Sequence, residues 1–222
     1  MNLHHSEGLT LRTYSYGESH KIGVFLCRKF GQLRALAYGV KKPGSRFGSS
    51  LEPFTRCRLI FYRKQNQALA VLKSSEILQA FPAYRQSWEV NLYYGYFVEL
   101  VMEFSREGAE CETLYRLVGA VLDASQSCPI EAVSRYFELW LLRLEGVLPP
   151  LQEKLPSALV AKTENLLREP PSQLEKSSWE ASELVELERF SERLIEYHLE
   201  KRLKTRRMLK GLLNSRTTEE QA

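Results

Sequence analysis

The apolar pattern changes its period once along the chain, at Phe81-Pro82, and this change constrains the fold most. Before it, apolar and polar residues alternate in short segments, which is typical of half-buried β-strands. After it, apolar residues recur at three- and four-residue spacing, which is typical of helices. The sequence therefore predicts an α+β, multidomain protein, with one domain over residues 1–80 and a second over residues 81–222.

Five antiparallel strands are expected in the first domain. They lie at Gly8–Tyr14, His20–Lys29, Gln32–Val40, Thr55–Tyr62 and Ala68–Ile77. Lys29–Gln32 is expected to form a hairpin turn between two of them. Five short strands with one long loop are enough for a small closed barrel, and the oligonucleotide-binding (OB) fold is the five-stranded candidate.

The second domain is predicted to be all-α. Its helices are expected at Tyr84–Phe104, Glu110–Gln126, Pro129–Glu145 and Ser157–Glu169, with a last one ending near Leu213. Pro129 suits the first turn of a helix, and Ser177-x-x-Glu180 resembles a capping box that starts the last helix. A short irregular insert is expected around residues 146–178.

Basic residues are concentrated in two stretches. Residues 34–64 hold eight against one acid and residues 200–210 hold six against one, while the rest of the chain holds 17 basic and 25 acidic residues. A basic patch on an acidic body localises an anionic partner. The candidate phosphate-binding residues are Arg34, Lys41, Lys42, Arg46, Arg56, Arg58 and Arg63.

Each of these basic features has a simpler alternative. The first stretch could be an ordinary solvated surface, and the second suits a helix end, where cations favour the helix dipole, as well as it suits a second nucleic-acid contact. Phe47, Tyr38 and Tyr62 could stack on bases or could belong to the core.

The sequence shows no catalytic or metal-binding pattern. Its four cysteines are far apart, which argues against a zinc cluster and a disulfide framework. We find no nucleophile–base pair and no phosphate-binding glycine loop, so the chain is expected not to be an enzyme and to need no cofactor. No segment approaches the roughly 18 apolar residues of a membrane span, and the N-terminus lacks a signal-peptide core, so a cytoplasmic location is expected.

Several short motifs occur in a specific order. They are Arg12–Ser19 (RTYSYGES), Phe30–Pro43 with its G-x-x-R, Leu51–Phe54 (LEPF), Glu76–Phe81, Arg135–Leu139 (RYFEL) and Arg202–Arg206 (RLKTR). In this order and with these spacings, the chain resembles the bacterial RecO family of DNA repair and recombination proteins along nearly its whole length.

This resemblance implies an OB-fold barrel followed by a helical domain. It implies binding of single- and double-stranded DNA, annealing of complementary strands, and recombinase loading at the nucleoid. The implied partners are RecR and the C-terminal tail of single-stranded DNA-binding protein. Many members carry a four-cysteine zinc module before the last helix, but residues 146–178 contain no cysteine, so the module is expected to be absent here.

The resemblance also implies a pocket for the acidic, apolar tail of single-stranded DNA-binding protein. Arg135 would be the guanidinium fork for the tail's carboxylate. The apolar slot beside it would be formed by Leu114, Leu117, Val118 and Leu139. The alternative is an ion pair within the helix, since Glu131 and Glu138 lie four and three residues from Arg135.

Two other functions remain open from the residues alone. A basic five-stranded barrel does not by itself distinguish DNA from RNA, so an RNA-binding module in translation or RNA turnover is the first alternative. An adaptor whose basic face binds an acidic protein is the second.

Overall fold

The computed structural model describes residues 2–42, 44–64, 67, 69–85, 87–176 and 178–219. The chain forms two compact units. The barrel unit comprises Met1–Pro82 and Val101–Arg116, and the helical unit comprises Ala83–Leu100 and Leu117–Ala222. The sequence places the domain boundary between residues 80 and 81, and that boundary stays a prediction.

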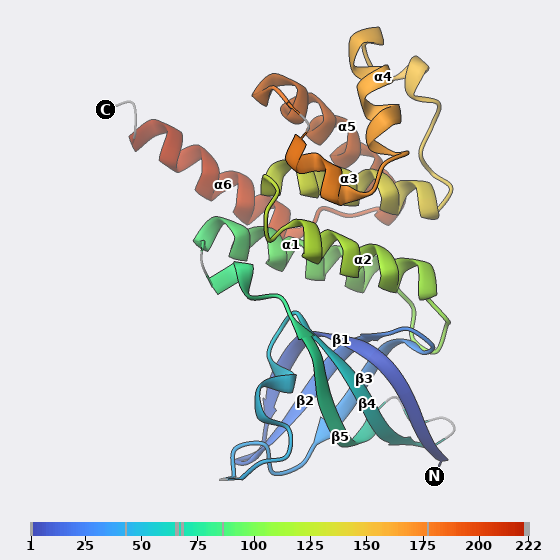
Figure 1. Cartoon of the computed structure of the whole chain (residues 1–222), viewed down its shortest axis with the longest axis vertical. Coiled ribbons are helices and arrows are strands. Elements are labelled where there is room, and N and C mark those ends of the chain that lie inside the picture. The colour runs from blue at the N-terminus through green and yellow to red at the C-terminus, as the bar shows by residue number, and fades with distance from the viewer. Residues whose placement is uncertain are drawn as a thin grey trace. The chain divides into compact units, whose positions relative to one another are not determined.

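The barrel unit is built on five strands (Figure 1). They are β1 (Asn2–Tyr16), β2 (His20–Cys27), β3 (Gly31–Ala37), β4 (Thr55–Arg63) and β5 (Leu69–Ala80). The strands close into a barrel in the order β1-β2-β3-β5-β4, with only the β3–β5 pair parallel. A closed five-stranded barrel of this kind is the OB fold, so the predicted fold is confirmed.

The alternation in the sequence decides which side chains fill the barrel. On β4, Cys57, Leu59 and Phe61 are fully buried, while Arg58 between them is exposed. The other strands contribute in the same way, because successive side chains of a strand point to opposite faces. The barrel core consists of Phe25, Cys27, Leu33, Ala35, Ala37, Phe47, Leu51, Cys57, Leu59, Phe61, Ala70 and Leu72.

The β2–β3 hairpin is held by residues that come much later in the chain. The Gln32 N–H donates to the Arg106 carbonyl over 3.1 Å, and the Gly108 N–H donates to the Phe30 carbonyl over 2.9 Å. Gly31 has φ +60°, and a Cβ there would lie 2.0 Å from the Arg106 carbonyl oxygen. Only glycine fits at this position, because the backbone conformation and the close approach both exclude a side chain.

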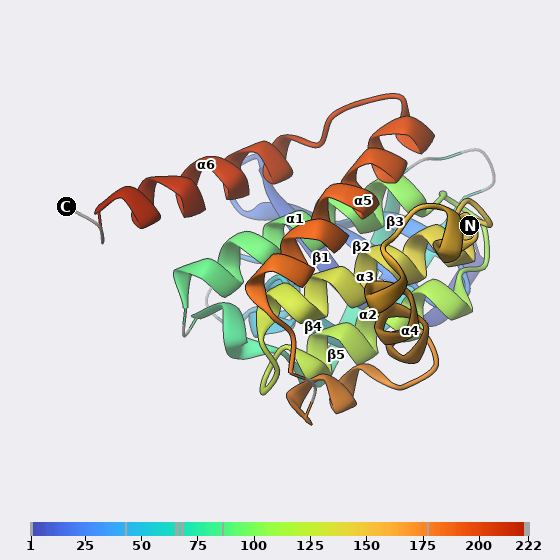
Figure 2. The same cartoon turned by 90° about the horizontal axis from the view of Figure 1, so that it is seen from above.

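The rest of the chain consists of helices and short 3-10 segments (Figures 1 and 2). The α-helices are α1 (Trp88–Phe104), α2 (Glu112–Ala124), α3 (Ile130–Leu144), α4 (Ser157–Leu166), α5 (Ala181–Leu199) and α6 (Lys204–Glu219). The 3-10 segments lie before α1, α4 and α5. Within the helical unit, α3 and α5 lie side by side (Figure 2). No helix of the described residues is both long and apolar enough to cross a membrane.

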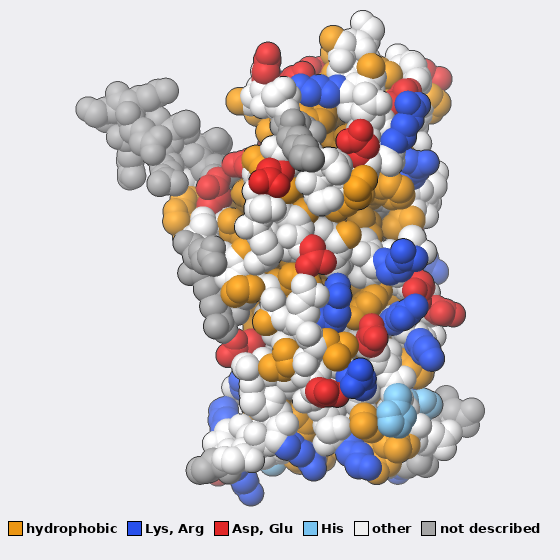
Figure 3. All heavy atoms as spheres, viewed as in Figure 1, with side chains coloured by type: hydrophobic (Ala, Val, Ile, Leu, Met, Phe, Trp, Pro, Cys, Tyr) orange, Lys and Arg blue, Asp and Glu red, His pale blue; other side chains and the backbone are white. Residues whose placement is uncertain are grey.

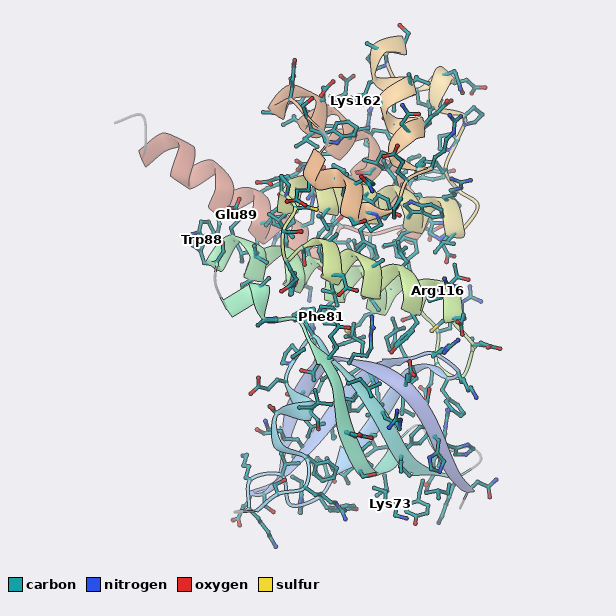
Figure 4. The ribbon with its side chains drawn as sticks, in the orientation of Figure 1. Lys73, Phe81, Trp88, Glu89, Arg116 and Lys162 are labelled. Carbon is teal, nitrogen blue, oxygen red and sulfur yellow. The ribbon has the colours of Figure 1, made fainter. Side chains whose placement is uncertain are left out.

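The ends of several helices differ from the sequence predictions. The first begins at Trp88, after a 3-10 turn at Pro82–Arg85, and Glu89 supplies an acid to its first turn (Figure 4). Pro129 is the N-cap of α3 rather than a residue of its first turn. The capping box of α5 is formed by Glu180 and Glu183, whereas Ser177 lies outside the described residues.

The prediction of one continuous last helix is wrong. Glu200 follows α5 in the left-handed conformation, with φ 54° and ψ 26°, and α6 starts only at Lys204. The Glu99 carboxylate accepts hydrogen bonds from the Lys204 N–H over 3.0 Å and the Thr205 N–H over 2.8 Å. A carboxylate at this place satisfies free N–H groups and favours the positive end of the helix dipole.

Residues 146–178, where a short irregular insert and a helix at Ser157–Glu169 are predicted, contain a helix close to the predicted one. They include α4 and two 3-10 segments, Leu151–Glu153 and Pro171–Lys176. Lys162 of α4 (Figure 4) forms an ion pair with Glu183 at 2.5 Å, and its ammonium lies 4.6 Å from the centre of the Trp179 ring.

Candidate nucleic-acid interface

Four predicted phosphate-binding residues are exposed on β3 and on the loop that follows it. These are Arg34, Lys41, Lys42 and Arg46. Within the described part of the chain, no ion pair joins any of them to an acid. Figure 3 shows Lys and Arg side chains around the lower end of the barrel. Because their charge is not neutralised internally, these four cations are available to an anionic partner.

The loop that carries three of these cations is anchored at both of its ends. The Lys41 N–H donates to the Ser19 carbonyl over 3.2 Å. Further on, Phe47 and Leu51 close the barrel core, and the Thr10 hydroxyl donates to the Ser50 carbonyl over 2.9 Å. The cations therefore lie on a positioned loop, although Pro43 within it is outside the described residues.

The other three predicted residues already have partners within the barrel unit. Arg58 forms an ion pair with Glu76 at 2.7 Å, and Arg63 forms one with Glu107 at 3.0 Å. Arg56 donates to the Gln79 side chain over 3.1 Å and also lies over aromatic rings. Both members of the Arg58 pair are more than half exposed, and such a pair contributes little and exchanges readily with a phosphate.

The predicted stacking residues divide into three cases. Phe47 is 2% exposed and belongs to the barrel core, which was the alternative to stacking on a base. Tyr62 is half-buried, and the ammonium of Lys73 (Figure 4) lies 5.8 Å from the centre of its ring. Tyr38 is 50% exposed, so among the three only its ring offers an open face.

Sequence reasoning missed Arg12. This half-buried residue of β1 pairs with Val24 of β2, which in turn pairs with Arg34 of β3. Arg12 and Arg34 therefore flank Val24 on one face of the sheet, because directly paired residues point to the same side. The sequence shows that Arg12 follows Leu11, which is buried in the structure, so an outward position for Arg12 could be predicted. The strand pairing that places Arg12 in line with Arg34 could not be predicted from it.

In the helical unit, Arg135 is buried and already paired with acids. It is 2% exposed, and its guanidinium lies 2.8 Å from the carboxylate of Glu138 and 3.2 Å from that of Glu188. The pairing with Glu138 is the intra-helix alternative that the spacing allowed. Glu138 is itself fully buried, and it also accepts hydrogen bonds from Tyr96 and Ser191.

The four apolar residues expected beside Arg135 are also buried, each at 8% exposure or less: Leu114, Leu117, Val118 and Leu139. Leu114 belongs to the barrel unit, and the other three belong to the helical unit. The tail pocket built from Arg135 and these residues stays a prediction.

The C-terminal basic cluster is not one uniform surface. Arg206 is 4% exposed, and its guanidinium lies 2.5 Å from the carboxylate of Glu188. Although burial disfavours the charged form, Glu138 and the other surrounding groups keep the pKa of Arg206 above its ordinary value. Lys210 pairs with Glu192. The exposed residues of the cluster are Lys201, Arg202, Lys204 and Arg207.

The thiols of the barrel unit are poor nucleophiles. Burial raises the pKa of Cys27 and of Cys57, and it raises the pKa of Cys111 to about 11. A thiol is reactive as the thiolate, so these three stay protonated at neutral pH. Among the residues that the structure describes, no group of three or more His, Cys, Asp or Glu side chains is placed to hold a metal ion.

Comparison with known proteins identifies both parts of the chain. Residues 1–81 match the family model for the N-terminal part of recombination protein O, and residues 85–155 match the model for its C-terminal part. The protein named DNA repair protein RecO of Syntrophus aciditrophicus (strain SB) is 38% identical over 149 residues, which cover 67% of this chain and 58% of that protein.

Other relatives carry the same name. The one from Exiguobacterium sibiricum (strain DSM 17290) is 37% identical over 147 residues, or 66% of this chain and 58% of that protein. The chain thus spans less than two thirds of the length of these relatives. The one from Koribacter versatilis (strain Ellin345) is 26% identical over 242 residues, covering 95% of this chain and 99% of that protein. With both halves matched in order on a five-stranded barrel followed by helices, the chain belongs to the RecO family.

Proposed function

We propose that this protein is a DNA repair and recombination mediator that binds single- and double-stranded DNA and anneals complementary strands without catalysing a reaction. The observation that carries the proposal is a set of four exposed cations that have no acid partner among the residues that the structure describes: Arg34, Lys41, Lys42 and Arg46. The relatives' name, DNA repair protein, supports DNA as the polyanion. The expected place of action is the nucleoid in the cytoplasm.

Phosphate neutralisation explains how such a surface promotes annealing. Two complementary strands repel each other through their phosphates, and bound cations displace the condensed counterions and lower this repulsion. The basic loop and the outer face of β3 bind backbone rather than base edges, so binding through them is independent of sequence. Pairing of the two strands then needs no chemical step by the protein.

Neutralising substitutions test the role of these four cations. Each of Arg34→Gln, Lys41→Gln, Lys42→Gln and Arg46→Gln is expected to weaken binding of a single-stranded oligonucleotide and to slow annealing. The slope of log affinity against log salt should become shallower by about 0.7 for each phosphate that the variant no longer neutralises. Arg168→Gln, a change at an exposed arginine of the helical unit, is the matched control.

The outcome decides between DNA and the alternatives. Unchanged annealing and an unchanged salt slope in the quadruple variant would contradict the proposal. An RNA of equal length that competes better than DNA at every salt concentration would favour an RNA-binding module. Failure of the unaltered protein to bind any oligonucleotide at low salt would favour a protein adaptor.

We further propose that the helical unit binds the C-terminal tail of single-stranded DNA-binding protein through Arg135, and that RecR is a second partner. Arg135 supports the tail site: within the described part of the chain its Nε is buried without a hydrogen-bond partner, and its guanidinium already binds carboxylates. A tail carboxylate would have to replace Glu188, which is the more exposed of its two partners.

Arg135→Lys tests the tail site, because lysine keeps the charge but loses the two-pronged geometry. Annealing should fall on strands coated with single-stranded DNA-binding protein and stay unchanged on bare strands. Equal annealing by the variant and the unaltered protein on coated strands, or an equal loss on bare strands, would contradict the assignment. A melting curve checks that the variant is folded.

A further inference from the structure

Three neighbouring strands of the barrel present a regular outer face. β2 lies between β1 and β3, and its pairings set which residues stand in line across the three strands. Val24 and Ile22 of β2 pair with Arg34 and Leu36, which alternate along β3 with core residues and so point outward. Two rows of side chains therefore cross the outer face: Arg12–Val24–Arg34 and Tyr14–Ile22–Leu36.

A third row continues this face beyond the end of β3. Tyr16 pairs with His20, and the His20 ring packs edge-on against Tyr38, with 5.0 Å between ring centroids. His20 is fixed further by the Gly39 N–H, which lies 3.0 Å from its Nδ1. Tyr16, His20 and Tyr38 thus line up parallel to the two rows described above.

The three tyrosines on this face are open to solvent. Tyr14, Tyr16 and Tyr38 are 48%, 49% and 50% exposed, although Leu36 beside them is only 6% exposed. A single exposed aromatic residue needs no explanation. Three on adjacent rows, held on paired strands over a buried apolar base, form a preorganised set of ring faces.

In these rows, in the β1–β2 turn and at residues 38–42, the charged side chains that the structure describes are cations, apart from a single acid. Arg12 and Arg34 form the next row, and Lys41 and Lys42 follow Tyr38 along the loop. Glu18 lies in the turn between β1 and β2. Rings flanked by cations suit a ligand with flat apolar groups on an anionic chain. A single strand of nucleic acid is such a ligand, because its bases can stack on the rings and its phosphates can bind the cations.

We propose that Tyr14, Tyr16 and Tyr38 form a stacking platform for the unpaired bases of single-stranded DNA, with the phosphates held by the adjacent cations. This inference rests on the proposed function and adds that the rings bind the bases of the single strand. A duplex keeps its base faces stacked inside, so it can use the cations but not the platform. The platform therefore distinguishes single strands from duplexes.

A triple variant, Tyr14→Ala with Tyr16→Ala and Tyr38→Ala, tests the platform. Its affinity for an oligothymidylate should fall by about tenfold or more, since stacking on one aromatic residue typically contributes that much. Its affinity for a duplex, and for an abasic oligomer with the same number of phosphates, should not change. The salt slope should also stay the same, because the cations that neutralise the phosphates are unaltered.

Two control variants separate stacking from folding. The corresponding triple Tyr→Phe variant keeps the rings and should bind as the unaltered protein does. Tyr197→Ala removes a tyrosine that is 86% exposed on α5 and should have no effect. Independently of any variant, photocrosslinking of the unaltered protein to an oligonucleotide containing 5-iododeoxyuridine should label peptides that contain Tyr14, Tyr16 or Tyr38.

Four results would overturn the inference. Unchanged oligothymidylate binding by the triple alanine variant, or crosslinks confined to other peptides, would show that the bases lie elsewhere while leaving the proposed function intact. An equal loss on the abasic oligomer would show that the tyrosines do not bind bases. No binding of any DNA by the unaltered protein would remove the proposed function and the platform together.

Discussion

Arg206 shows at the scale of one residue how a basic side chain can serve the fold instead of a ligand. Its guanidinium lies 2.5 Å from the Glu188 carboxylate, 3.8 Å from that of Glu138, and 5.1 Å from the centre of the Tyr96 ring. Glu138 is fully buried and depends on such partners, because an uncompensated buried carboxylate is costly. Arg206 therefore ties α6 to the interior of the helical unit.

Replacing Arg206 tests this role. Arg206→Ala should lower the free energy of unfolding by about 3–5 kcal/mol, because it leaves the buried carboxylate of Glu138 with one arginine fewer. Arg202→Ala, four residues earlier, should change it by less than about 0.5 kcal/mol, since that side chain is 88% exposed. Urea unfolding measures both, and a similar small effect of the two changes would contradict the role.

Some of these residue-level features could be predicted from the sequence and others could not. The inward residues of β4 follow from alternation alone, which is a local rule. The sequence predicts Arg135 as the carboxylate fork of a tail pocket or as the partner of a glutamate in its own helix, and it predicts Arg206 as one cation of a basic helix end. Neither prediction includes Glu188, which lies 53 residues from Arg135 along the chain. A basic residue's burial depends on such long-range pairing, which a charge count does not contain.

At the scale of elements, the break between α5 and α6 depends on one unfavourable backbone conformation. Glu200 has φ 54°, a left-handed conformation that costs a residue with a Cβ about 1 kcal/mol. Glu200→Gly should therefore stabilise the protein by about 0.5–1 kcal/mol. Glu186→Gly, in the exposed part of α5, should instead destabilise it by about 1 kcal/mol. Thermal unfolding of both variants checks the opposite signs, and destabilisation by Glu200→Gly would refute this account of the break.

The start of α5 should respond to acid. Hydrogen bonds from Lys162 and from the Glu180 N–H lower the pKa of Glu183 below its ordinary value of 4.5. A carboxyl group with a lowered folded-state pKa stabilises the protein above its unfolded pKa and loses this contribution as the pH falls through the folded value. The stability difference between the unaltered protein and Glu183→Gln should therefore be larger at about pH 6 than at about pH 3. Urea unfolding at both pH values measures it, and a difference that does not shrink in acid would contradict the assignment.

At the scale of the whole chain, the change of period located the barrel but not every segment that completes it. The sequence predicted a boundary after residue 80, where alternation ends. Val101–Arg116 nevertheless groups with the barrel, and it holds the β2–β3 hairpin through the Gln32 and Gly108 N–H groups. Periodicity reports the structure of each segment and not its tertiary partners, so this return to the barrel could not be predicted.

Native-state hydrogen exchange tests which unit this returning segment belongs to. The amides of Gly108 and Cys111 donate to the Phe30 and Arg28 carbonyls, so they should open together with the amides of β2 and β3 as denaturant is added. The amides of α3 and α5 should form a separate group if the two units unfold independently. If Gly108 and Cys111 exchanged with α3 and α5 while the strands stayed protected, the boundary after residue 80 would hold. Exchange together with the strands would instead define a barrel unit made from two separate stretches of chain. Gly31 lets the second stretch approach the first, because a side chain at this position would collide with the Arg106 carbonyl.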